Sequence, residues 1–198
     1  MSEYIKFKCE HTVVPAVLFD GFAELNACRQ KLRRLEVIGM NANGIGFGNL
    51  SIRDGTTNSF YITASATGGI SDLTLAGYAR VVAYDFARNW LRCEGSVIAS
   101  SESLTHAAVY ESEAKAGAVI HGHNLKLWAT LLGHAPTTSK AIEYGTPEMA
   151  YEVRRLFKTT DVKSRKIFVM AGHEGGIITF GKDLEEAFTV LERAISNK

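Results

Sequence analysis

The sequence is poor in cysteine, and the few cysteines lie far apart. Only Cys9, Cys28 and Cys93 occur among the 198 residues, and none belongs to a Cys-x-x-Cys pair. An odd number of widely spaced thiols argues against a disulfide framework or a cysteine-rich metal site. No charged-then-apolar leader opens the chain. We therefore expect a cytoplasmic protein whose cysteines are reduced packing residues.

Charge of one sign and long apolar runs are also lacking. The net charge is +1, and lysine and arginine are scattered. Neither nucleic acid nor an anionic membrane is therefore an expected partner. The longest apolar runs, such as residues 13–19, are too short to span a bilayer. Repeats, low-complexity tracts and linkers are absent, and 46% of the residues are hydrophobic. These features predict one domain over residues 1–198.

The first half of the chain predicts one helix followed by a sheet. Asp20 is a candidate N-cap of a helix that ends near Ile38, with Gly39 after its end. Four basic side chains of this helix are interpreted as a solvated face: Arg29, Lys31, Arg33 and Arg34. Alternating apolar residues and turn residues predict short strands at 4–8, 50–53, 60–63, 73–86 and 90–94. We expect these strands to pair mainly antiparallel.

A glycine-rich stretch, residues 41–55, precedes and includes the strand 50–53. Its loop, 44–49, would let backbone N–H groups approach an anion closely. The pattern matches neither a P-loop nor a dinucleotide fingerprint, because no Gly-Lys-Ser/Thr follows and a strand rather than a helix comes next. The stretch is therefore either a bare turn or an anion site. Residues 64–69 form a second loop of small side chains.

A helix is predicted to begin at Ser100-Ser101-Glu102 and to end near Lys115. Free N–H groups at a helix start, together with two serine hydroxyls, suit a phosphate or a carboxylate. The alternative is simple capping by Ser101, with Glu102 favoured in the first turn by the helix dipole.

The strongest chemical signal is the stretch 116–124. The apolar residues 118–120 lead into His121, Gly122 and His123. If this segment is a strand, side chains alternate, so both imidazoles project from one face and can bind one metal ion. Gly122, without a side chain, would leave them uncrowded.

His173 is the natural third ligand, since it follows an apolar strand predicted for residues 166–171 and is flanked by glycines. Three protein ligands with one open position are typical of a catalytic metal site. Glu102 could fill that position at rest or act as the base that moves a proton. Each histidine taken alone is more often a packed or exposed residue, and His134 is expected to be exposed.

The second half of the chain carries further helix signals. Asn124 is a candidate cap for a helix at 125–132, and Thr146-Pro147-Glu148 is a strong helix start. Residues 177–180 predict a strand. Asp183 to Glu186 resembles a capping box for a last helix that ends near residue 196.

Taken together, these motifs resemble the class II aldolase/adducin family over about residues 22–195. The resemblance rests on six segments in the same order: GNLSIR (48–53), ITAS (62–65), SSESLTHAAVY (100–110), AVIHGHN (118–124), YGTPEMA (144–150) and GHEGGIITFG (172–181).

The resemblance implies a single α/β/α layered domain around a mostly antiparallel sheet. It implies a divalent metal, most often zinc, on His121, His123 and His173, with Glu102 as the catalytic acid/base. The residues implied to bind phosphate are Asn49, Ser65, Ser100 and Ser101. A homotetramer with sites between subunits is also implied. Gly46 and Ala66 depart from the family's phosphate loop, which has threonine and glycine there. No tyrosine is assigned as proton donor, because Tyr144 aligns poorly.

The implied function is a metal-dependent, aldolase-type lyase of carbohydrate metabolism. It would cleave a C–C bond in a small hydroxy-carbonyl compound, for example a sugar phosphate, through a metal-stabilised enediolate. For proton transfer, Glu102 is expected to have a pKa nearer neutral than that of a free glutamate. An epimerase, a dehydratase or a decarboxylase on the same metal site is an alternative. So is a scaffold like the adducin head, which has the fold without the chemistry.

Overall fold

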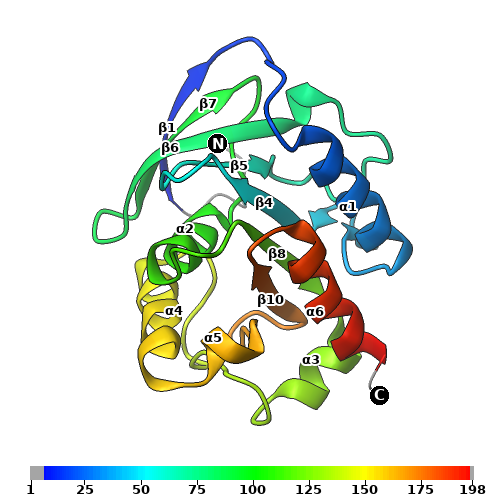
Figure 1. Cartoon of the computed structure of the whole chain (residues 1–198), viewed down its shortest axis with the longest axis vertical. Coiled ribbons are helices and arrows are strands. Elements are labelled where there is room, and N and C mark those ends of the chain that lie inside the picture. The colour runs from blue at the N-terminus through cyan, green and yellow to red at the C-terminus, as the bar shows by residue number, and fades with distance from the viewer. Residues whose placement is uncertain (1–6, 197–198) are drawn as a thin grey trace.

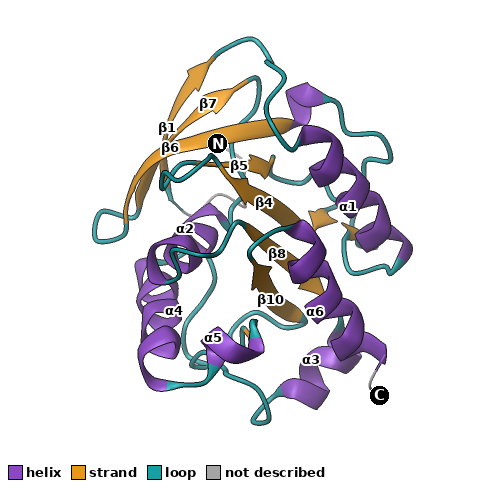
Figure 2. Cartoon of the chain, in the orientation of Figure 1, coloured by secondary structure: helices purple, strands orange, loops and turns teal. Residues whose placement is uncertain are grey.

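One large mixed sheet forms the middle of the protein. The computed structural model describes residues 7–196, and in that range eight strands are hydrogen-bonded in the order β1-β7-β6-β5-β4-β8-β10-β9 (Figure 2). Their bounds are β1 Lys8–Val13, β4 Asn49–Arg53, β5 Phe60–Thr63, β6 Tyr78–Asp85, β7 Trp90–Gly95, β8 Ala118–His123, β9 Ile167–Val169 and β10 Gly176–Gly181. Only β1 and β7 pair parallel. The predicted, mostly antiparallel sheet is therefore confirmed.

Helices cover both faces of this sheet, as Figure 1 shows. One layer contains α2 (Ser103–Ser112), α4 (Pro147–Thr159) and the short α5 (Val162–Arg165). The other contains α1 (Phe22–Arg34), α3 (Leu125–Leu131) and α6 (Leu184–Ser196). Each layer has its own apolar core. In β8, Val119 packs into the α2/α4 core, while Ala118 and Ile120 pack into the α1/α6 core. The predicted three-layer α/β architecture is confirmed.

Three of the predicted helix starts have the expected caps. The Asn124 side chain accepts a hydrogen bond from the Leu127 N–H at 2.9 Å. Thr146 caps α4 in the same way, with Pro147 at its first position. At α6, Asp183 Oδ1 accepts from the Glu186 N–H at 2.8 Å, and the Glu186 carboxylate accepts in return from the Lys182 N–H at 2.7 Å. Local side-chain chemistry therefore sets these ends, as the sequence predicts.

The bounds of two helices differ from the prediction. α1 begins after Gly21, which has a φ of 85°, rather than at an Asp20 cap, and it ends at Arg34 rather than near Ile38. Glu36 adopts a left-handed conformation with a φ of 55°, which turns the chain out of the helix. Gly39 instead begins β2 (Gly39–Met40), a two-residue strand that pairs with β3 (Gly46–Phe47). α2 is shorter than predicted, and Ser101 does not cap it.

The basic face of α1 is only partly solvated, contrary to the prediction. Lys31 and Arg34 are exposed, but Arg29 is only 1% exposed. Its guanidinium donates hydrogen bonds to backbone carbonyls of residues 67, 68, 70 and 71. From the sequence alone, several basic residues close together predict a solvated helix face. The nearby loop gives one of them enough carbonyl acceptors to be buried.

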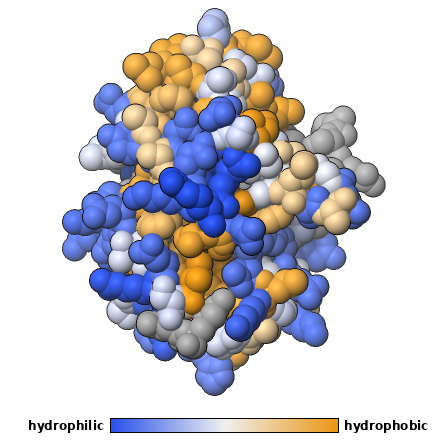
Figure 3. Space-filling model, turned by 90° about the vertical axis from the view of Figure 1, so that its right-hand side faces the viewer, coloured by the Kyte–Doolittle hydropathy of each residue, from blue (hydrophilic) through white to orange (hydrophobic). Residues whose placement is uncertain are grey.

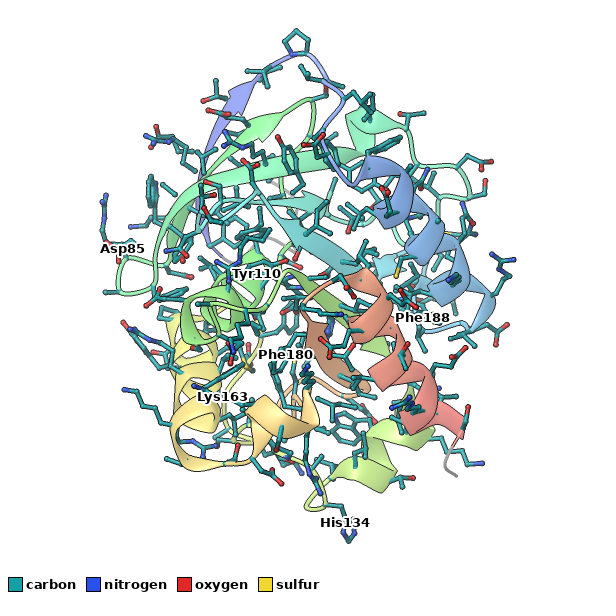
Figure 4. All side chains as sticks on the ribbon, viewed as in Figure 1. Asp85, Tyr110, His134, Lys163, Phe180 and Phe188 are labelled. Atoms are coloured by element: carbon teal, nitrogen blue, oxygen red, sulfur yellow. The ribbon has the colours of Figure 1, made fainter. Side chains whose placement is uncertain are left out.

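The predicted edge strand at residues 4–8 lies mostly outside the described residues, and the observed edge strand β1 begins at Lys8. The three cysteines are free, with the Cys9 and Cys93 sulfurs 3.6 Å apart. Figure 4 shows Phe180 and Tyr110 inside the protein and His134 projecting away from it, which agrees with the expected exposure of His134. None of the described helices is long and apolar enough to span a bilayer.

Apolar side chains gather at the end of the molecule where β1 leads into α1. Val13, Val17 and Leu18 are 74%, 72% and 72% exposed. Figure 3 shows hydrophobic surface at this end, at the top of the view, whereas hydrophilic residues dominate the middle of the same face. Patches of exposed apolar side chains mark contact surfaces more often than isolated ones do.

Candidate metal centre and its cavity

His121 and His123 lie at the end of β8 and point to the same side of the sheet. Their Nε2 atoms are 3.0 Å apart. Gly122 faces the opposite side, where an added Cβ would meet Val37 at 3.3 Å and Leu191 at 3.7 Å. Its missing side chain therefore makes room for the α1/α6 core rather than for the imidazoles, which corrects that part of the prediction.

His173 reaches the same point from the turn between β9 and β10. The ligand atoms of His121, His123 and His173 all lie within 4.8 Å of one another, and this is the only such group among the described residues. Gly176 makes the approach possible, because a Cβ there would lie 3.2 Å from His173 Cγ and 3.3 Å from His121 Cε1. The glycine that follows His173 at position 176 thus leaves room for the imidazoles themselves.

The donor set fits one divalent metal ion. Two nitrogen ligands of a tetrahedral zinc ion, at about 2.0–2.1 Å from it, stand roughly 3.3 Å apart. The 3.0 Å between the Nε2 atoms of His121 and His123 is close to that value. Burial lowers the pKa of His123 to about 4 and lowers that of His121 well below its usual range. Both imidazoles are therefore neutral at pH 7, which is the form that binds metals.

Glu102 lies beside this group, at the residue that precedes α2. It is 2% exposed, its Oε1 is 3.3 Å from His173 Nδ1, and its Oε2 accepts a hydrogen bond from the Thr105 hydroxyl at 3.0 Å. Burial acts to raise the pKa of Glu102, but His121, His173 and Thr105 outweigh it and hold the pKa at about 2. The expected shift toward neutral is therefore wrong. The carboxylate is ionised and is a proton acceptor.

A second group of buried polar side chains lies behind Glu102, one helical turn along α2. His106 Nδ1 is 2.7 Å from the Ser51 hydroxyl, which is also 2.8 Å from the Tyr110 hydroxyl. Burial lowers the pKa of His106 to about 3, with Glu102 acting in the opposite direction. His106 is therefore a neutral core residue that links α2 to β4.

The candidate anion-binding residues meet at one cavity of about 230 Å³ that also contains the three histidines and Glu102. Asn49, Ser65, Ser100 and Ser101 all line it. Asn49 is only 6% exposed, and its Oδ1 has no hydrogen-bond partner in the protein. Glu102 Oε1, His121 Nδ1 and His173 Nδ1 are likewise buried without one. Such a cluster of unsatisfied polar atoms is typical of a site that completes its bonds with a ligand.

The two departures from the family's phosphate loop lie against each other. A Cβ on Gly46 would fall 2.3 Å from the carbonyl oxygen of Ala66, and Ala66 has a φ of 60°. A threonine at position 46 could not fit beside this carbonyl. In this chain the Ala66 carbonyl therefore occupies the space where a side chain at position 46 would stand.

Sequence patterns did not assign two aromatic residues of the cavity wall. The Tyr144 ring stacks on that of His173 with centroids 4.2 Å apart and planes 24° apart, and the Phe47 ring is 5.5 Å from that of His123. Both residues line the cavity. Tyr144 opens the segment YGTPEMA and Phe47 precedes GNLSIR, but neither pattern predicts a ring beside the histidines, which only the folded chain reveals. His11, which bonds the Gly95 carbonyl, lies outside the cavity.

A family comparison decides what kind of protein has this arrangement. The model of the "Class II Aldolase and Adducin N-terminal domain" matches residues 33–195. The chain belongs to this family. Proteins of the class II aldolase family use a divalent metal, and the three-histidine group is where this member could bind one.

Solved structures of class II aldolases share the fold. An L-fuculose 1-phosphate aldolase has a TM-score of 0.66 and 21% identity, over 92% of this chain and 84% of that one. The L-fuculose-1-phosphate aldolase from Thermus thermophilus has a TM-score of 0.61 and 21% identity, over 89% of this chain and 91% of that one. YgbL from Klebsiella pneumoniae, described as a putative aldolase/epimerase/decarboxylase, has a TM-score of 0.64 and 19% identity, over 86% of this chain and 83% of that one. Among curated proteins, none is similar enough in sequence to count as a relative.

Removing one histidine of the group should remove the metal and leave the fold. We expect the wild-type protein to carry roughly one equivalent of divalent metal and His121→Ala and His173→Ala to lose it, because two imidazoles hold an ion far less tightly than three. Elemental mass spectrometry of protein purified without chelator measures this, with circular dichroism as the check on folding. His134→Ala, at an exposed position, is the control. Full metal content in either variant would exclude the three-histidine site.

His106 should make the protein sensitive to acid. Its pKa is lowered in the folded state, so its neutral form contributes stability above pH 6.5, and this is lost as pH falls toward 3. Between pH 7 and pH 4.5, we expect the free energy of unfolding of His106→Gln to fall by about 2–3 kcal/mol less than that of the wild type. Urea unfolding at both pH values measures it. His134→Gln should behave like wild type, and equal losses in all three proteins would contradict the assignment.

Proposed function

We propose that this protein is a zinc-dependent lyase of the aldolase type. It would cleave a C–C bond in a small hydroxy-carbonyl compound with an anionic group, such as a sugar phosphate. The observation that carries the proposal is the meeting, in one cavity, of three histidines, an ionised glutamate and a set of neutral hydrogen-bonding groups. Family membership supports metal-dependent, aldolase-like chemistry.

His121, His123 and His173 would hold the metal through their nitrogens. When bound, a divalent cation supplies Lewis-acid stabilisation for negative charge that develops on substrate oxygens as the bond breaks. Nitrogen ligands alone, with one position open, suit zinc.

Glu102 would move the proton. Its Oε1 is buried, has no hydrogen-bond partner and lies beside His173, so it points to where the reacting carbon would be held. With a pKa of about 2 the carboxylate is ionised but only weakly basic, so it would accept a proton only from a strongly acidified substrate group, and its protonated form would readily return that proton to a carbanion. The Thr105 hydroxyl holds the other carboxylate oxygen and so fixes which oxygen reacts.

The part of the cavity next to Glu102 in the chain would bind the anion. Ser100 and Ser101 stand just before α2, where the helix dipole favours negative charge. Asn49 and Ser65 complete this anion-binding part. A cavity of about 230 Å³ suits a small substrate and would keep bulk water from the reacting atoms.

Replacing Glu102 separates catalysis from metal binding. We expect Glu102→Gln to keep its metal and to lose at least about a hundredfold in turnover, because the amide cannot accept the proton. Metal-loaded wild-type protein is first screened against sugar phosphates and hydroxy-ketones, with products identified by mass spectrometry. Thr105→Val is the milder companion variant.

The products decide the reaction. Two carbonyl fragments support the lyase, whereas an isomer of equal mass, loss of water or release of carbon dioxide would replace it by an epimerase, a dehydratase or a decarboxylase. A Glu102→Gln protein with normal turnover would remove Glu102 from the mechanism. Metal-free protein that takes up no metal on titration would favour a non-catalytic scaffold.

We also propose that the chain assembles into a homotetramer, with the exposed apolar segment around Val17 and Leu18 in a contact between copies. Burying exposed apolar surface of this kind would stabilise the assembly. Light scattering on the eluting protein should give four times the 21.6 kDa chain mass, and Val17→Asp with Leu18→Asp should give smaller species. A wild-type monomer, or a tetramer unaffected by both charges, would refute this assignment.

A further inference from the structure

The wall that faces the proposed anion has no cation of its own. None of the described side chains that line the cavity is a lysine or an arginine. Outside this lining, Arg29 of α1 is a buried positive charge that contacts the segment following Ser65 and Ala66.

Arg29 holds this segment by its backbone. The guanidinium donates to the Thr67 carbonyl at 2.7 Å, to the Gly68 carbonyl at 3.4 Å and to the Ser71 carbonyl at 3.2 Å, and it also bonds the Ile70 carbonyl. Among the described residues, no carboxylate forms an ion pair with it. The guanidinium therefore keeps its positive charge, with Asp72 near enough to attract it but not to form an ion pair with it.

The turn that Arg29 binds follows directly on residues 64–66, which line the cavity. The Thr67 hydroxyl donates to the Ala64 carbonyl at 2.8 Å, which ties the Arg29-bound turn to Ala64, Ser65 and Ala66. On the side of the cavity, the Gly68 nitrogen lies 2.9 Å from the position that a Cβ on Gly46 would take. The turn is therefore fixed between Arg29 on one side and the glycine-rich loop on the other.

The orientation of the peptide groups extends the effect of the Arg29 charge across the turn, toward the side where Gly68 packs against Gly46. In a trans peptide the N–H points opposite to the C=O. Because Arg29 binds the carbonyls, the N–H ends of the peptides after Thr67 and Gly68 point away from it. The Arg29 cation lies at the carbonyl end of each peptide, and the partly positive N–H lies at the other end. Both therefore raise the electrostatic potential on the N–H side of the turn.

We propose that Arg29 is a positioning residue of the anion subsite, which fixes the wall at Ser65 and Ala66 and supplies the positive potential that the lining lacks. The inference rests on the proposed function, since the subsite is the one proposed there. Arg29 contacts neither substrate nor metal in this arrangement, and its effect is on the binding of the anion.

Two substitutions separate charge from shape. Arg29→Lys keeps the charge and loses the planar fork, whereas Arg29→Gln loses the charge and keeps an amide donor. Arg34→Gln, on an exposed side chain of the same helix, changes the net charge equally and is the matched control. The probe is inorganic phosphate, titrated into metal-loaded full-length protein by calorimetry at low salt. Metal content, unfolding temperature and hydrogen exchange of residues 64–73 are measured on each variant.

We expect Arg29→Gln to weaken phosphate binding roughly tenfold and Arg29→Lys by only about two- to threefold, as one buried charge near the subsite requires. Metal content and the Arg34→Gln affinity should be unchanged. Faster exchange of residues 64–73 should accompany both Arg29 variants. If either Arg29 variant fails to fold, Arg33→Gln, which removes a longer bond to the Gly69 carbonyl at 3.4 Å, should still show a smaller loss of affinity.

The possible failures can be told apart. Phosphate affinity that is unchanged in Arg29→Gln, but lost in Ser100→Ala, would overturn the role of Arg29 and keep the proposed subsite. Equal losses in the Lys and Gln variants would make Arg29 a purely structural residue and also overturn the proposal. A wild-type protein that binds no phosphate would overturn both the subsite and this inference.

Discussion

The alternation of side chains along β8 is the constraint on which the rest of the structure depends. This strand lies inside the sheet, paired with β4 on one side and β10 on the other. Ile120 and Gly122 face the α1/α6 core, and His121 and His123 face the α2/α4 side. A shift of the register by one residue would place both imidazoles in an apolar core and Ile120 in the cavity. The fold and the candidate metal centre are therefore specified by the same pattern.

The cavity concentrates polar atoms that the protein itself does not satisfy. A carboxylate oxygen, an amide oxygen and two imidazole nitrogens are buried there without partners. Leaving a buried polar group unpaired costs about 1–3 kcal/mol each, so the surrounding structure must hold them in place. Helix α2, buried on every side from Ser103 to Tyr110, and the Ser51–His106 contact provide that rigidity around Glu102. The loss of stability is consistent with a site made to bind a ligand.

Several parts of this arrangement are readable from the sequence because they depend on neighbouring residues. The caps at Asn124, Thr146 and Asp183 form as predicted, since each joins groups about three residues apart. The His-x-His pattern places two imidazoles on one side of a strand for the same reason. The early end of α1, by contrast, follows from the backbone turn at Glu36, for which the local sequence holds no signal.

The sequence by itself determined the family, the layered α/β class, the ligand types and the residues that gather at the cavity, because these are encoded in short-range patterns and residue chemistry. Only the tertiary structure decided the protonation of Glu102, the burial of Arg29 and the place of Tyr144. The pKa of Glu102 depends on two histidines from other strands and turns, and Arg29 is buried because a loop about forty residues away offers it carbonyls. Tyr144 joins the site by stacking on His173. Such effects arise from groups distant in sequence, and only folding brings them together.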